Sequence, residues 1–206
     1  MAKLKFILDA GHGGATLAAG YVTPGKRSPD GVNGIIYEGL SNRAFVHDIA
    51  FQLALRGRDV EIVSDTAKDV SLGIRAFRAN QAAQGKECLF VSFHSNAAIG
   101  VFGPYTGFEI FTYLGEDESD RYAELIGNLL SAKYQGIKWR KESRGGNDGP
   151  MDKDKDLGVL RNLDKGVPGV LFECLFMDGS EDYMKLTDPI WRANFVTNFV
   201  EVLCAL

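Results

Sequence analysis

The chain has 206 residues, which suits one domain with a sizeable core and is short for two. Hydrophobic residues make up 45% of it and charged residues 24%, as in ordinary soluble globular proteins. The formal net charge of −4 argues against a general electrostatic grip on nucleic acid. No stretch approaches the roughly 20 apolar residues of a membrane-spanning helix, so we expect no membrane insertion.

The amino-terminal residues and the cysteines indicate where the chain is made. The first apolar run covers only residues 6–8 and is interrupted by Asp9, so this segment does not have the pattern of a signal peptide. Cys88, Cys174 and Cys204 show no paired spacing, and the first two fall in apolar runs, which predicts buried thiols. We therefore expect a protein made in a reducing compartment, without a disulfide framework.

In its first third the chain predicts a strand, a long loop, a helix and a second strand. Residues 4–9 form a short apolar run next to glycine-rich sequence, which predicts a buried strand. Residues 11–39 are rich in glycine, proline and polar side chains, and long loops of this kind are usually functional or disordered. Ser41 can cap a helix that Gly57 ends, and residues 60–63 predict the next strand.

The remainder of the chain continues the alternation of helices and strands. In chain order we predict a helix capped by Ser71 and ended by Gly85, strands at residues 88–93 and 108–113, a helix at residues 120–133, a strand at residues 167–172 and a helix opened by Pro189. Residues 138–156 are polar and charged, which favours a solvated surface loop over a lid on the site. The alternation predicts an α/β fold, a single domain over residues 1–206, with a twisted, mostly parallel central sheet of about six strands and helices on both faces.

Ionisable side chains stand at the ends of three predicted strands. His12 and His94 follow apolar runs, and Glu173 ends another. Ligands of open α/β sheets bind outside the carboxyl ends of the strands, so these residues can converge on one crevice. Glu38 lies at the exit of the long loop, just before the first predicted helix. Two histidines and a glutamate can supply a catalytic zinc site that leaves one position for water, and the remaining glutamate can act as the base.

Each of these residues also has an ordinary structural interpretation. A single histidine after a strand is more often part of a turn or of the core, and the helix dipole favours a glutamate such as Glu38 near a helix start. Glu173 is harder to explain in this way, because a carboxylate inside an apolar run costs free energy unless it is paired or ligating. Burial would also raise its pKa, as a general base near neutrality requires. The spacing alone leaves both interpretations open.

Five blocks of sequence carry a resemblance to a known family. The first three are Ile-Leu-Asp-Ala-Gly-His-Gly-Gly at residues 7–14, Glu38 with Asn42 four residues on, and Phe-Val-Ser-Phe-His-Ser-Asn-Ala at residues 90–97. The other two are Ser-Asp-Thr at residue 64 with the stretch to Asn80, and Val-Leu-Arg at residue 159 with Pro-Gly-Val-Leu-Phe-Glu at residues 168–173. In this order, from about residue 4 to the C-terminus, the chain resembles the zinc-dependent N-acetylmuramoyl-L-alanine amidases of the Amidase_3 family.

The resemblance implies a site and a reaction. It implies one zinc ion bound by His12, Glu38 and His94, with Glu173 as the catalytic glutamate. The implied substrate is bacterial peptidoglycan, and the implied reaction is hydrolysis of the amide bond between N-acetylmuramic acid and L-alanine. The segments 15–37 and 138–156 match no part of the family pattern, so the resemblance leaves the preferred stem peptide open.

The biological setting is a further expectation. The last predicted helix reaches the end of the chain, so we expect one catalytic domain without a separate wall-binding domain. With no signal-peptide pattern, this favours a phage or prophage endolysin that reaches the wall after host lysis or holin-type release. An intracellular enzyme that recycles wall fragments is an alternative. The alternative activities are another zinc amidohydrolase or carboxypeptidase and a non-catalytic peptidoglycan-binding protein.

Overall fold

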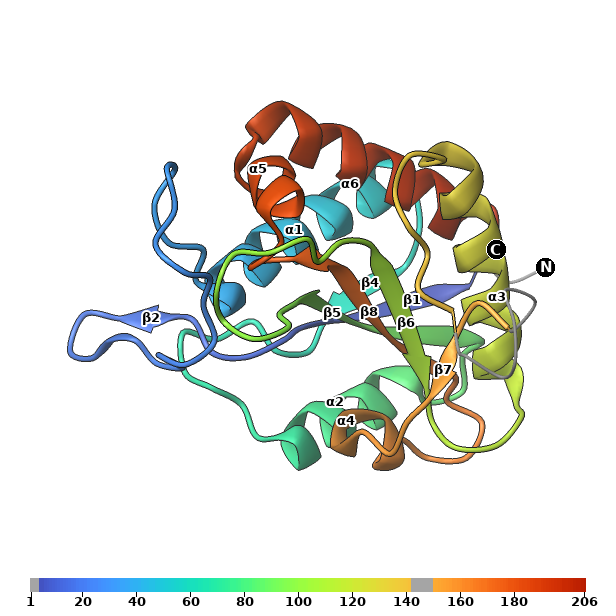
Figure 1. Cartoon of the computed structure of the whole chain (residues 1–206). Coiled ribbons are helices and arrows are strands. Elements are labelled where there is room, and N and C mark those ends of the chain that lie inside the picture. Colours follow the sequence, from blue (N-terminus) through green and yellow to red (C-terminus); the bar gives the residue numbers. More distant parts are fainter. Residues whose placement is uncertain (1–3, 142–149) are drawn as a thin grey trace.

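A six-stranded sheet forms the centre of the molecule (Figure 1). The structure is a computed structural model that describes residues 4–141 and 150–206. The strands lie in the order β4-β1-β5-β8-β6-β7, and every neighbouring pair is parallel except β6 and β8. They are β1 (Lys5–Ala10), β4 (Val60–Ile62), β5 (Cys88–Asn96), β6 (Phe108–Thr112), β7 (Lys153–Asp154) and β8 (Gly169–Phe176). The predicted six-stranded, mostly parallel sheet is confirmed.

Helices cover both faces of this sheet, as the sequence predicts (Figure 1). One face packs against α1 (Glu38–Leu55), α3 (Glu118–Lys133), α5 (Ser180–Thr187) and α6 (Pro189–Cys204). The other face packs against α2 (Leu72–Ala83) and the short α4 (Gly158–Arg161). In the part of the chain that the structure describes, no helix is long and apolar enough to cross a membrane.

An aromatic cluster joins the two central strands to α1 and α6. The ring of Phe93 in β5 lies 5.0 Å from that of Phe45 in α1, and the ring of Phe172 in β8 lies 5.0 Å from that of Phe199 in α6. All four side chains are buried, so this contact anchors β5 and β8 from one side of the sheet. Because side chains alternate between the two faces of a strand, the next residue in each strand points to the opposite face.

Those next residues are His94 and Glu173, and both lie inside their strands. We expected each at or beyond a strand end, but β5 runs on to Asn96 and β8 to Phe176. His94 pairs with Glu173 in the parallel register of the two strands. The predicted strand ends were therefore too early, because polar residues that face a groove interrupt the apolar pattern without ending the backbone pairing.

Several predicted boundaries of the helices and loops can be compared with the structure. Ser71 caps α2 by accepting a hydrogen bond from Ile74 N, and Pro189 opens α6, as predicted. The prediction that Ser41 caps α1 is wrong: the helix begins at Glu38, three residues before Ser41, and its cap position is Tyr37. The long loop is confirmed, although it contains a small antiparallel ribbon of β2 (Ala15–Thr16) and β3 (Gly20–Tyr21).

The charged segment after residue 138 is more structured than expected. Its residues 142–149 lie outside the described part of the chain. Met151 and Asp152 are buried, and β7 adds to the edge of the sheet beside β6. The prediction of a solvated surface loop is therefore wrong for residues 151–154. The prediction of buried thiols is confirmed for Cys88 and Cys174.

Candidate active site

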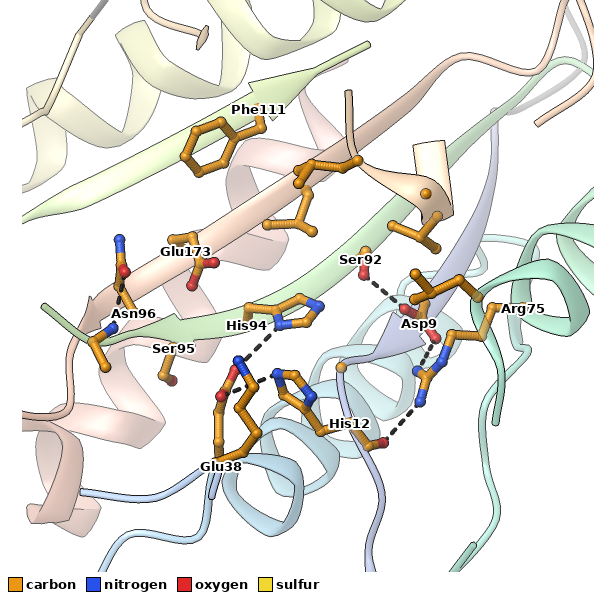
Figure 2. A pocket seen from close by; sticks show the side chains of 18 of the residues that line it. Asp9, His12, Glu38, Arg75, Ser92, His94, Ser95, Asn96, Phe111 and Glu173 are labelled. Atoms are coloured by element: carbon orange, nitrogen blue, oxygen red, sulfur yellow. Dashed lines mark hydrogen bonds and ion pairs between the residues drawn. The ribbon is translucent and has the colours of Figure 1, made fainter. Parts of the chain in front are cut away.

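The metal-ligand candidates come from three elements that meet where β1 and β5 end. His12 follows β1, Glu38 is the first residue of α1, and His94 lies in β5 (Figure 2). His12 Nε2 lies 3.1 Å from Glu38 Oε2, and His94 Nδ1 lies 3.1 Å from Glu38 Oε1. The two imidazole rings meet edge to face with their centres 5.0 Å apart. Glu38 thus sits between the two histidines, and one donor atom from each of the three residues lies within 4.8 Å of the others.

Close backbone approaches make this convergence possible. A Cβ on Gly11 would lie only 2.1 Å from the ring of His94. A Cβ on Gly39 would lie only 1.9 Å from the carbonyl oxygen of Gly13. His12 itself has a φ of 65°, in the left-handed region that residues with a Cβ rarely adopt. Glycines on both segments therefore let the start of α1 approach the loop after β1 closely enough for the three side chains to meet.

The charges at these residues suit a metal cation. Burial acts to raise the pKa of Glu38, but its hydrogen bonds with His12 and His94 outweigh burial and hold that pKa well below its usual value. Burial acts to lower the pKa of His94, and the carboxylates of Glu38 and Glu173 outweigh it and raise that pKa. Two imidazole nitrogens and a carboxylate are the His₂Glu donor set of catalytic zinc sites, so the residues present fit zinc.

Two arginines hold the backbone of His12 in its unusual conformation. Arg75 Nη2 donates to the carbonyl oxygen of His12 at 2.8 Å, and Arg43 Nη1 donates to the same oxygen at 3.0 Å. Arg75 is almost completely buried and pairs with Asp9 at 2.6 Å, while Ser92 Oγ donates to the other oxygen of Asp9 at 2.6 Å (Figure 2). This network fixes the direction in which the His12 ring points.

Glu173 lies across the β5–β8 pair from His94 and has different surroundings from Glu38. Its Oε2 is buried and has no hydrogen-bond partner within the described residues. Burial raises the pKa of Glu173 to about 7; the charge of His94 acts against this shift, and those of Glu38 and Glu109 add to it. A carboxylate with this pKa takes up and releases a proton near neutral pH, which is what a general base requires.

Glu109 is a site residue that sequence reasoning missed. It pairs with Glu173 in the antiparallel register of β6 and β8. Its carboxylate accepts hydrogen bonds from Asn96 Nδ2 at 3.0 Å and Lys153 Nζ at 3.1 Å, and it also pairs with Arg140. The signal in the sequence was a lone glutamate inside the apolar run at residues 108–113, the same kind of signal that singled out Glu173.

These residues line one groove of about 510 Å³. Its polar lining includes His12, Glu38, His94, Asn96, Glu109 and Glu173. Its apolar lining includes Val70, Leu72, Phe111, Leu157, Val159 and Leu171. The four residues predicted for the site are therefore brought together. Two other residues of the resembling blocks have local partners. Asn96 bonds Glu109 and the backbone of Ala97, and Arg161, which is not among the residues that line the groove, pairs with Asp156 at 2.9 Å.

The fold is shared with solved N-acetylmuramoyl-L-alanine amidases and with the catalytic domain of an endolysin. An N-acetylmuramoyl-L-alanine amidase from Clostridium difficile 630 superposes with a TM-score of 0.74 at 21% identity, over 100% of this chain and 97% of that one. The amidase AmiC2 of Nostoc punctiforme superposes with a TM-score of 0.73 at 22% identity, over 99% of this chain and 97% of that one. The catalytic domain of the CD27L endolysin superposes with a TM-score of 0.68 at 22% identity, over 98% of this chain and 97% of that one.

The family follows from the sequence itself. The Amidase_3 family, described as N-acetylmuramoyl-L-alanine amidase, matches residues 6–205. The chain therefore belongs to the N-acetylmuramoyl-L-alanine amidase family, which confirms the resemblance seen in its sequence blocks. No curated protein matches the chain. The endolysin setting stays a prediction.

Proposed function

We propose that the protein hydrolyses the amide bond between N-acetylmuramic acid and L-alanine in peptidoglycan, with one zinc ion held by His12, Glu38 and His94. The observation that carries this proposal is the position of Glu173. Glu173 is paired with His94 in the strand register, and its Oε2 has no hydrogen-bond partner among the described residues; His94 is one of three residues whose donor atoms lie within 4.8 Å of one another. A base next to a three-ligand set is the arrangement that water-activating zinc hydrolases use.

The roles of the residues follow from their environments. When bound, zinc would lower the pKa of a water molecule in the site and polarise the carbonyl group that is attacked. Glu38, whose pKa is held low, keeps its negative charge and serves as a ligand. Glu173, whose pKa is raised to about 7, accepts the proton of the attacking water and then donates it to the amine of L-alanine as that group leaves. The two glutamates thus take different roles because their surroundings move their pKa values in opposite directions.

The proposal is tested by identifying the bond that is cut. Purified peptidoglycan is incubated with zinc-loaded protein, with chelator-treated protein and with the Glu173→Gln variant, and the newly freed amino groups are identified by residue. We expect zinc-dependent release of the amino group of L-alanine, with the sugar strand uncut. Glu181→Gln is the matched control, because the side chain of Glu181 is exposed and lies outside the groove.

Other outcomes identify the rival functions. Release of a different amino group would point to a carboxypeptidase or another amidohydrolase. Co-sedimentation with walls without any product would point to a binding protein. Either result would overturn the proposal.

A further inference from the structure

Most of the acidic side chains that line the groove have a charged or histidine partner. Among the described residues they are Asp9, Glu38, Asp69, Glu109 and Glu173. Asp9 and Asp69 pair with Arg75, and Glu109 pairs with Lys153 and Arg140. Glu38 is held by the two histidines, which leaves Glu173, the proposed base, as the one acidic side chain of this set without a hydrogen-bonding or ion-pair partner among the described residues. Apart from Glu173, the acidic side chains of the lining are therefore held by cations or by the two histidines.

Three cations line the same groove and are not paired in this way. Lys26, Arg27 and Lys155 are exposed, and none has an acidic partner in the part of the chain that the structure describes. Arg75, the remaining lysine or arginine of the lining, forms ion pairs with Asp9 and Asp69. The uncompensated charge of the groove is thus positive, although the whole chain has a formal net charge of −4.

The backbones of the three cations are fixed on two sides of the site. The backbone carbonyl oxygen of Lys26 accepts a hydrogen bond from Glu38 N at 2.9 Å, and Arg27 forms a β-bridge with Tyr37. Both residues therefore belong to the side of the site that carries Glu38. Lys155 donates from its backbone to Thr112 O at 3.0 Å, and its Nζ lies 5.1 Å from the ring centre of Phe111. Figure 2 shows Phe111 across the groove from Glu38. An elongated ligand bound between the two sides therefore passes between cations.

The charge of one of these cations also acts on the proposed base. The charge of Lys26 acts on Glu173 and favours its ionised form. A peptide that extends from the cleaved amide advances about 7 Å over two residues, so its second residue stays within reach of side chains that surround the site. In the stem peptide that residue is a γ-linked D-glutamate, whose α-carboxyl group is either free or converted to a carboxamide.

We propose that Lys26, Arg27 and Lys155 bind the free carboxylate of the second stem residue, so that the enzyme prefers stems that carry this carboxylate over stems that carry a carboxamide. The inference rests on the proposed function for the position of the stem in the groove. Cations attract a carboxylate but not a neutral amide, and each exposed ion pair of this kind changes affinity by about two- to fivefold.

The experiment compares two muramyl tripeptides that differ only at this group, N-acetylmuramoyl-L-Ala-γ-D-Glu-L-Lys and its D-isoglutamine counterpart. For the unmodified protein we expect kcat/KM to be about tenfold higher for the free carboxylate, mostly through KM, and the preference to shrink at high ionic strength. Each of Lys26→Gln, Arg27→Gln and Lys155→Gln lowers the ratio, and the triple variant brings it close to one. Lys165→Gln, an exposed lysine outside the groove, leaves the ratio unchanged.

The outcomes separate this inference from the proposed function. Equal kcat/KM for the two substrates overturns the carboxylate preference while the amidase function stands. A preference that survives in the triple variant overturns the assignment to these side chains. If neither substrate is cut, the proposed function fails, and calorimetric titration with the two free tripeptides then decides the inference: equal affinities overturn it.

Discussion

At the scale of single residues, the contrast between Glu38 and Glu173 determines the chemistry. Both carboxylates are close to His94, but only Glu38 has hydrogen-bonding partners for its two oxygens. The hydrogen bonds of Glu38 stabilise its charged form, whereas burial without such partners destabilises the charged form of Glu173. A substitution at either position should therefore affect a different step.

Glu173→Gln should lower kcat by about 10²- to 10⁴-fold, because it removes proton transfer while keeping the shape of the side chain. Zinc affinity, measured by competition with a chromogenic chelator, should stay within about twofold. His94→Ala should lose both zinc and turnover, because a ligand is missing. Near-normal turnover by Glu173→Gln would contradict the role given to this residue.

The pH profile should follow the same carboxylate. Since only the ionised form of Glu173 accepts a proton, kcat/KM should rise as the pH increases toward and past the pKa of about 7. A bound cation favours the ionised form, so the midpoint of this acid limb should lie at pH 7 or below in zinc-loaded protein. The limb is measured from kcat/KM between pH 5 and 9 under constant ionic strength. An activity that increases as the pH falls through this range would contradict the assignment.

At the scale of elements, the loop after β1 is held by arginines that come from two helices. Arg43 belongs to α1 and Arg75 to α2, and both donate to the carbonyl oxygen of His12. The helices that cover opposite faces of the sheet thus fix one ligand between them. Partners of this kind orient a metal ligand and limit the freedom that binding must remove.

Arg43→Met should therefore weaken zinc binding by about tenfold or more. Its effect on folding should be smaller than that of an Arg75 variant, which would leave the buried carboxylate of Asp9 without its cation. Arg78→Met is the matched control, because Arg78 donates in a similar way to the carbonyl oxygen of Val63, away from the site. Equal zinc affinities of the two variants, measured by chelator competition, would show that the His12 contact does not position the ligand.

The order and type of the elements could largely be predicted from the sequence, since apolar runs and helix periods are strong local signals. The ends of β5 and β8 could not, because His94 and Glu173 are polar residues whose backbones still pair within the sheet. The antiparallel direction of β6 depends on long-range pairing that leaves no mark in its own residues. For the site, the sequence singled out the four metal and base candidates that the structure brings together, but not Glu109 or the hydrogen bonds of Arg43 and Arg75 to the carbonyl oxygen of His12. Their partners come from distant parts of the chain.

At the scale of the whole molecule, the proposed zinc site links α1, β5 and the loop after β1. An ion that binds only the folded chain adds about 4 kcal/mol to the free energy of unfolding when its free concentration is 1,000 times its Kd. For a chain of this size that corresponds to an increase in Tm of about 8–16 °C.

Removal of zinc with a chelator should lower the Tm by about this amount, as measured by calorimetry with and without added zinc. Glu173→Gln should keep the zinc-dependent increase, because Glu173 is not one of the proposed ligands. His94→Ala should lose it. A Tm that does not respond to zinc in the unmodified protein would show that the ion makes no such link.

The close approach of the loop after β1 to the start of α1 has a consequence for protein engineering. Gly39 faces the carbonyl oxygen of Gly13, and Gly11 faces the ring of His94, at distances that admit no side-chain carbon. A designer who copies only the two histidines and Glu38 onto another scaffold, without this close backbone approach, would therefore keep those three side chains too far apart to share an ion. The unit to be transplanted is the pair of crossing backbones, together with their glycines and the arginines that hold them.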